Sequence, residues 1–277
     1  MKPLLKSPTK ATSLGLWMLL FCAQLLFCNV ALGQVKKQVF RADLIKGLDT
    51  FMHTVIPNAT LMEGDKLMAL DEFFRALKKL NPLNNNGDLL VRYAWPPVLP
   101  PKPLTGKQFS EKLKSLELKY QEVFTAKDYV GCASNSSSSR GYPCALWTLF
   151  HYWTVQNGLP SYPLFPGNVL RTIWNFVKYF YDCPDCVSNF EKMVKRRPIE
   201  LVKTHDAEIL WLWETHNEFN KLTATQFPSA NMCPTCRNKD QSWRNDEVLK
   251  YLKSLYAEAN FSFDGLSTSK GYKIKSL

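Results

Sequence analysis

The chain has 277 residues, and 45% of them are hydrophobic, which is enough to bury at least one substantial core. Its formal net charge is +11, from 35 basic and 24 acidic residues. The basic residues form short clusters without interleaved aromatic residues, so they indicate a solvated surface with weak attraction for acidic partners, and we expect no nucleic-acid partner.

The first 33 residues have the pattern of a secretory signal peptide. Three lysines precede an apolar run over residues 14–28, and small residues stand at positions 31 and 33. An uncleaved signal anchor is the alternative, but the run is short for a membrane span. We therefore expect residues 1–33 to be removed, which lowers the net charge from +11 to +8. The mature chain is then expected in the lumen of the secretory pathway (ER or Golgi) or outside the cell, with no transmembrane segment.

Two amphipathic patterns predict helices in the region that follows. They run over about residues 39–54 and from Asp65 to about Asn81, with apolar residues at helical spacing. The asparagines and glycine at 84–87 and the prolines at 96–103 predict a loop, because dense proline prevents regular helix. We place a soft boundary here, so residues 34–105 are expected to form a helical appendage that ends in a stiff connector.

The remaining patterns are also helical. A lysine-rich helix is predicted over residues 106–124, and Pro143 suits the first turn of a helix that continues over 145–153. Further helices are predicted over residues 168–181, 183–195, 206–222 and 243–256. No stretch shows period-two alternation. The expected class is all-α, a compact bundle of four or five helices preceded by two or three more, with a flexible basic tail over 259–277.

Cysteine usage agrees with an oxidising compartment. Six of the eight cysteines follow the predicted signal peptide, and an even number there indicates three disulfides. Glycosylation sequons at Asn58, Asn135 and Asn260 fit the same compartment. The spacing favours closure within each Cys-x-x-Cys motif, giving the pairs Cys132–Cys144, Cys183–Cys186 and Cys233–Cys236.

A Cys-x-x-Cys pair can be a structural disulfide, a half-site for zinc or a redox pair. The two pairs lie much further apart than the roughly 15–20 residues of compact four-cysteine zinc sites, so no metal is expected. A structural disulfide suits Cys233 and Cys236, which lie in a loop. Cys183 and Cys186 stand where a helix begins, and free backbone N–H groups there stabilise a thiolate. This position favours redox activity.

A redox pair needs an electron acceptor, and two predicted helices carry polar and aromatic side chains on apolar faces. Trp147 and His151 are four residues apart and share one face, while His216, Asn217 and Asn220 cluster on another. A single histidine on such a face is more often a satisfied core residue. Two such faces beside a redox pair could line a planar cofactor, which the pattern itself does not identify.

Three motifs resemble, in order and spacing, the Erv/ALR sulfhydryl oxidase domain, in the version found in quiescin sulfhydryl oxidases. They are Arg140–His151, Phe180–Cys186 and Leu210–Asn220. The resemblance covers about residues 38–258, and its first part, 38–125, is similar to the degenerate helical Erv-like region of that family. It implies that 106–258 is an FAD-binding sulfhydryl oxidase domain.

The resemblance also implies a reaction and a site. Cys183 would exchange with incoming dithiols, and Cys186 would lie next to the flavin and pass electrons on, so that O2 is reduced to hydrogen peroxide. Cys132–Cys144 and Cys233–Cys236 fall on non-catalytic disulfides of the family. The positions that contact FAD in the family correspond to Arg140, Trp147, His151, Asp185, Asn189, Trp213, His216, Asn217 and Asn220.

The chain departs from the family pattern in several places. Asn189 stands where the family commonly has histidine, and the loop after Phe227 lacks a lysine and a tryptophan that contact FAD, although Lys221 could supply a cation. Nothing before residue 38 could hold a thioredoxin-like domain, so we expect electrons from thiol-containing protein substrates or from a separate thioredoxin-fold donor. These departures motivate an alternative function, a non-catalytic secreted helical scaffold (a pseudo-oxidase). No oligomeric state is predicted.

Overall fold

The computed structural model describes residues 38–96, 102–133, 141–159, 163–220 and 226–272. The predicted signal peptide, residues 1–33, lies outside these ranges. The described residues form helices and four isolated β-bridges but no strand, which confirms the all-α prediction. None of the described helices is long and apolar enough to cross a membrane.

The first helices are α2 (Arg41–Thr50), α3 (Gly64–Lys79), α4 (Asn85–Ala94) and α5 (Gly106–Lys119). A turn of π-helix, η1 (Phe51–Val55), extends α2 without a break. The prediction of a loop at 84–87 was wrong, because α4 begins there. The Asn84 side chain caps this helix by accepting a hydrogen bond from the Gly87 amide, and apolar residues further along α4 are buried.

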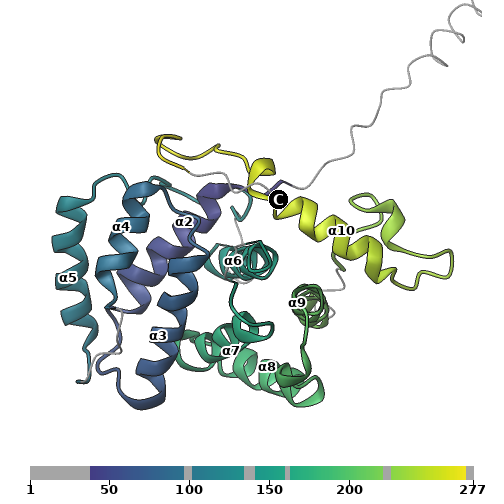
Figure 1. The fold of residues 1–277 in the computed structure, drawn as a ribbon, viewed down its shortest axis with the longest axis horizontal. Helices are drawn as coiled ribbons and strands as arrows, with labels where there is room; N and C mark the ends of the chain where they lie inside the picture. The colour runs from purple at the N-terminus through teal and green to yellow at the C-terminus, as the bar shows by residue number, and fades with distance from the viewer. Residues whose placement is uncertain (1–37, 97–101, 134–140, 160–162, 221–225, 273–277) are drawn as a thin grey trace, which may run out of the picture. The chain divides into compact units, whose positions relative to one another are not determined.

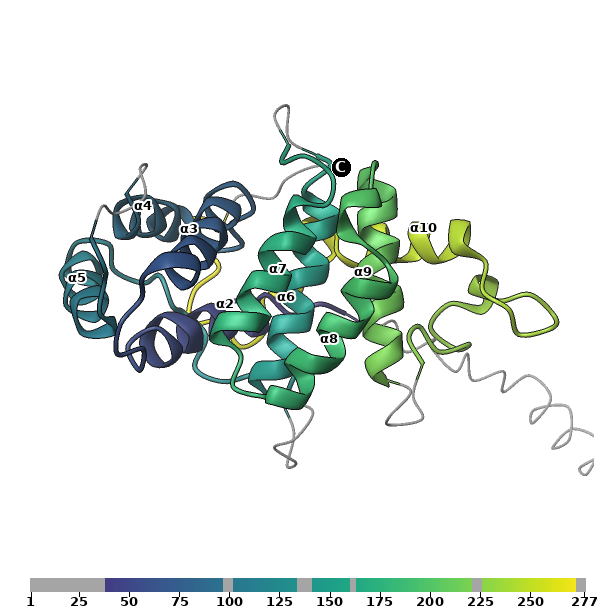
Figure 2. The same ribbon diagram turned by 90° about the horizontal axis from the view of Figure 1, so that it is seen from below.

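The later helices are α6 (Tyr142–Gln156), α7 (Asn168–Phe180), α8 (Pro184–Arg196), α9 (His205–Asn220) and α10 (Asn245–Leu255). Figures 1 and 2 show α6 between α2 and α9, and α3 beside α7. Helix α6 is buried over nearly its whole second half, because neighbours cover it on several sides. The central position of α6 brings the N-terminal helices against those that carry the Cys183–Cys186 motif.

One aromatic cluster joins the two regions on either side of residue 105. The Phe51 ring lies 4.5 Å from Phe73 and 5.1 Å from Phe176, measured between centroids, and Phe73 lies 5.0 Å from Trp153. All four side chains are fully buried. Such ring pairs add about 0.5–1.5 kcal/mol each beyond the area they bury. Among the described residues, the predicted boundary therefore falls inside a single packed unit with a shared core.

The prediction of a flexible tail from residue 259 was wrong as far as residue 272. The buried Arg41 guanidinium lies 5.0–5.4 Å from the ring centroids of Phe261, Phe263 and Tyr272. Ser262 also pairs with the backbone beside Arg41. These three aromatic residues of the tail therefore hold it against α2 by cation–π contact and burial. Residues 273–277 lie outside the described ranges.

The same arginine yields a test of this packing. Arg41 donates to the Pro82 carbonyl at 2.7 Å and lies 3.8 Å from the Glu258 carboxylate, which also accepts from the Tyr152 hydroxyl. We expect Arg41→Ala to lower the free energy of unfolding by about 3–5 kcal/mol, because it leaves a buried carboxylate without its cation. Urea unfolding followed by circular dichroism measures this.

The matched control is Lys195→Ala, which removes an exposed i,i+4 ion pair with Glu191. This change should cost no more than about 0.5 kcal/mol. The double variant Arg41→Met/Glu258→Gln should lose less free energy of unfolding than Arg41→Met and Glu258→Gln lose in sum. The reason is that the double variant removes both charges at once. Wild-type stability in Arg41→Ala would contradict the assigned role of the pair.

Candidate functional site

The Cys183–Cys186 disulfide closes the first turn of α8. Cys183 is the N-cap residue of this helix, and Pro184 occupies its first turn. The Cys183 sulfur accepts a hydrogen bond from the Cys186 amide at 3.2 Å. When the disulfide is reduced, this N–H group and the positive end of the helix dipole stabilise negative charge on the Cys183 sulfur. The local fold therefore makes Cys183 a good leaving group in thiol exchange.

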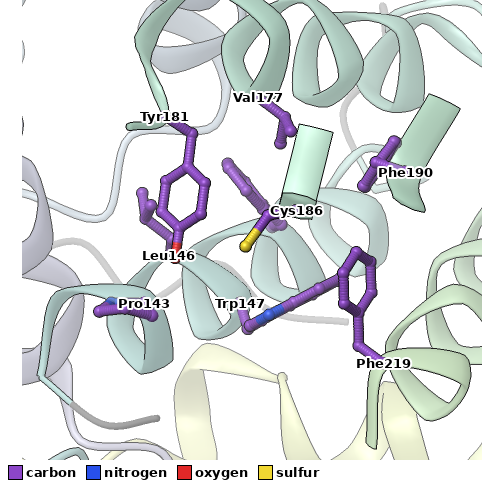
Figure 3. Close-up of a pocket in the computed structure, with 9 residues that line it drawn as sticks. Pro143, Leu146, Trp147, Val177, Tyr181, Cys186, Phe190 and Phe219 are labelled. Atoms are coloured by element: carbon purple, nitrogen blue, oxygen red, sulfur yellow. The ribbon is translucent and has the colours of Figure 1, made fainter. Parts of the chain in front are cut away.

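The other sulfur faces a cavity of about 80 Å³. Figure 3 shows the Cys186 sulfur pointing into the space between Tyr181, Trp147 and Phe219. Cys183 does not line this cavity, so the two sulfurs have different surroundings. The remaining walls are apolar and come from α6, α7 and α8: Pro143, Leu146, Phe150, Val177 and Phe190.

The two polar faces predicted from the sequence meet beside Trp147, which lines this cavity. The rings of Trp147 on α6 and His216 on α9 stack with 4.2 Å between centroids and 2° between planes. His151 Nε2 lies 3.0 Å from His216 Nδ1, so one imidazole donates a hydrogen bond to the other. His151 is buried and also stacks on Tyr256 at 5.3 Å. The result is a continuous aromatic wall from α6 across α9 to the end of α10.

Two other predicted cofactor residues bind the protein backbone. The Asn217 amide accepts from the Phe227 N–H at 2.8 Å and donates to the Phe227 carbonyl at 2.7 Å. Trp213 Nε1 donates to the same carbonyl at 2.6 Å. Both side chains are buried. In this structure they hold the segment that begins at residue 226 against α9.

The other predicted site residues lie away from the Cys186 sulfur or outside the described ranges. Asp185 is exposed, and Asn189 lines a separate surface groove between α8 and α9. Phe219 lines both that groove and the cavity. Asn220 is half-buried at the end of α9, while Arg140 lies outside the described residues, as do Lys221 and the sequon at Asn135.

Several apolar residues of the cavity were not among the predicted site residues, although the spacing of some in the sequence indicates that they share a helix face with a site residue. Phe190 follows Cys186 by four residues and therefore shares its helix face. Val177 precedes Tyr181 by the same interval, on α7 and just past its end. Phe219 had no such signal, because its helix meets α8 only through the tertiary packing.

The other two disulfides support the ends of the site. Cys132 pairs with Cys144 in the first turn of α6, and the Cys132 amide donates to the Asp43 carboxylate at 3.1 Å. Cys233 pairs with Cys236 across a single turn of 3-10 helix after α9. These pairings are the ones that the cysteine spacing favoured.

Comparisons with known proteins agree with this geometry. Residues 144–244 match the Erv1 / Alr family. Sulfhydryl oxidase 1 of Cavia porcellus is 30% identical over 252 residues, which cover 81% of this chain and 40% of that protein. Sulfhydryl oxidase 2 of Homo sapiens is 29% identical over 261 residues, covering 85% and 37%. The chain thus spans about 40% of the length of these curated relatives.

A solved structure is similar over nearly its full length. The sulfhydryl oxidase fragment of human QSOX1 superposes with a TM-score of 0.70 and 26% sequence identity. The match covers 81% of this chain and 98% of the fragment. The helices around the Cys183–Cys186 motif therefore have the arrangement of that fragment's fold.

The backbone anchor at Phe227 gives a second test. Asn217→Ala should destabilise the protein by about 1–3 kcal/mol, because it removes two buried hydrogen bonds to the Phe227 backbone. Limited proteolysis should then cut the segment that begins at residue 226 faster than in the wild type. The control Asn231→Ala changes an exposed asparagine of the same segment and should stay within about 0.5 kcal/mol. Equal protease sensitivity of the two variants would show that Asn217 is not the anchor.

Proposed function

We propose, from the match of residues 144–244 to the Erv1 / Alr family, that the chain is an FAD-dependent thiol oxidase. It would oxidise dithiols of proteins or small molecules to disulfides, with O2 as the final acceptor and hydrogen peroxide as the product. The observation that carries the proposal is the asymmetry of the Cys183–Cys186 disulfide. Only the second sulfur faces an aromatic cavity, and the first caps the helix.

The residues around Cys186 suit the flavin of FAD in their chemistry. Apolar and aromatic walls favour a planar ring system, and the His151–His216 pair lies beside Trp147, which lines the cavity. The cavity of about 80 Å³ is below the roughly 300–1,000 Å³ of typical ligand pockets, so FAD as a whole would extend beyond it. When bound, FAD would accept two electrons from the reduced cysteine pair and deliver them to O2.

The protein's own part in the reaction is thiol–disulfide exchange. A substrate thiolate attacks the Cys183 sulfur, the bond between Cys183 and Cys186 breaks, and Cys186 leaves as a thiolate. The second substrate thiol then attacks the substrate sulfur of this mixed disulfide and releases Cys183 as a thiolate. The substrate gives up two electrons and two protons and becomes a disulfide, while the cysteine pair gains the two electrons.

The surroundings of each sulfur match its proposed role. The N–H group of Cys186 and the start of α8 stabilise the Cys183 thiolate that is released. The apolar walls around Cys186 put the second sulfur beside the space proposed for the cofactor. The predicted signal peptide and three disulfides support a site of action in the secretory pathway or outside the cell.

A non-catalytic secreted scaffold is the second candidate function. It is favoured by the small cavity and by the position of Asn189 in a different groove from Cys186. Such a protein would keep the helices and the disulfides but would not turn over thiols.

The visible absorption spectrum of the purified protein separates the two candidates. We expect a flavin band and oxygen uptake with dithiothreitol. Cys186→Ser should keep the flavin band but lose oxygen uptake to background, because the sulfur that faces the cofactor is gone. The exposed neighbour Ser188→Ala serves as control and should retain wild-type rates. A protein without flavin absorbance or oxygen uptake would favour the scaffold.

A further inference from the structure

A second hollow adjoins the redox motif. It is a groove of about 650 Å³, lined by the end of η1 and the residues after it, by Lys66 of α3, by the start of α6 and by residues 178–182 at the end of α7. Pro143 and Tyr181 line both this groove and the Cys186 cavity. Its volume falls in the range of about 300–1,000 Å³ that is typical of ligand pockets. The groove therefore lies next to the cavity. Apart from Pro143 and Tyr181, its lining residues are different.

The groove ends at the disulfide. Tyr181 and Asp182 line it, and the next residue is Cys183, whose amide donates to the Tyr181 carbonyl at 2.9 Å. Consecutive Cα atoms are about 3.8 Å apart, so the lining of the groove reaches the residue next to Cys183. A ligand of the groove thus approaches the sulfur that we propose reacts with substrate thiols.

The groove carries more positive than negative charge. Lys66 and Lys178 line it, with ammonium groups 5.6 Å and 4.8 Å from the ring centroids of Phe180 and Tyr179. Asp182 is the one acidic side chain among its described lining residues. A hydrogen bond with Tyr179 raises the pKa of Lys178, which therefore stays protonated at neutral pH. The two lysines offer cations to an acidic ligand.

The lining residues also suit a polypeptide. The phenol of Tyr181 is neutral, since burial raises its pKa, and it can donate or accept a hydrogen bond. The other walls mix apolar surface with short polar side chains, as on Thr54 and Val55 of η1. The π-helical turn places these two residues at the groove, and such turns are frequent at functional sites.

We propose that this groove binds the polypeptide that flanks the cysteines of a protein dithiol, with acidic side chains of that segment on Lys66 and Lys178. The inference rests on the proposed thiol oxidase function and specifies its substrate. The reaction is the exchange described above, in which the protein dithiol loses two electrons and two protons and the Cys183–Cys186 pair gains the electrons. A small dithiol reaches Cys183 without occupying the groove.

The test uses two synthetic dithiol peptides that are identical except for glutamates or lysines beside the cysteines. The enzyme is the full chain, measured alongside Asn58→Gln, which removes the exposed sequon that lines the groove. At low salt we expect kcat/KM to be roughly tenfold higher for the acidic peptide than for the basic one. Two ion pairs between its glutamates and the two lysines would account for a difference of this size. The preference should shrink in 0.5 M salt, which screens exposed charges.

Charge reversal locates the preference. Lys66→Glu/Lys178→Glu should abolish or invert it, while oxidation of dithiothreitol stays within about twofold of the parent rate. The matched control is Lys107→Glu/Lys114→Glu, which changes the same charge at two exposed lysines of α5 and should keep the preference. An unchanged preference in the groove variant would overturn the proposal, as would an equal loss in the control.

A binding measurement separates this inference from the oxidase function. Fluorescence anisotropy with labelled peptides that carry serine in place of both cysteines requires no turnover. Tighter binding of the acidic peptide, lost in Lys66→Glu/Lys178→Glu, supports the groove even if dithiothreitol is not oxidised. Equal binding of the two peptides would contradict the proposed role of the groove, even if the protein is an active oxidase.

Discussion

The position of Cys183 as the N-cap residue of α8 is the constraint on which the proposed chemistry depends. Helix α7 ends at Phe180, two residues turn the chain, and α8 begins directly after Cys183. The two sulfurs therefore share one helical turn but not one environment. The first receives an N–H hydrogen bond from the helix start, and the second faces the aromatic cavity. This difference would give the proposed electron flow a direction that a symmetric disulfide would lack.

The turn between α7 and α8 also lies between the Cys186 cavity and the lysine-lined groove, which differ in polarity and charge. On one side, the cavity at Cys186 is apolar and aromatic, which suits a planar cofactor. On the other, the groove that ends at Asp182 carries two lysines and open polar surface, which suits a polypeptide. Tyr181 lines both. The arrangement places the proposed donor and acceptor of electrons on either side of one disulfide.

The N-terminal helices belong to this arrangement and do not merely precede it. Phe51 and Phe73 pack on Phe176, so η1 and α3 share a core with the helix that leads to Cys183. The same packing places η1 and Lys66 on the wall of the lysine-lined groove. A region that carries none of the predicted cofactor residues thus forms much of the surface proposed to bind substrate.

The sequence by itself determined the helices around the redox motif and the disulfide pairing. The apolar stripe over 168–181 and the Cys-x-x-Cys spacing are local, and helix faces follow directly from residue intervals. Only the tertiary structure decided which faces meet. It joined His151 to His216, turned Trp213 and Asn217 toward the Phe227 backbone, and packed the tail on Arg41. The physical reason is that these contacts join residues distant in the chain, and no spacing rule specifies long-range packing.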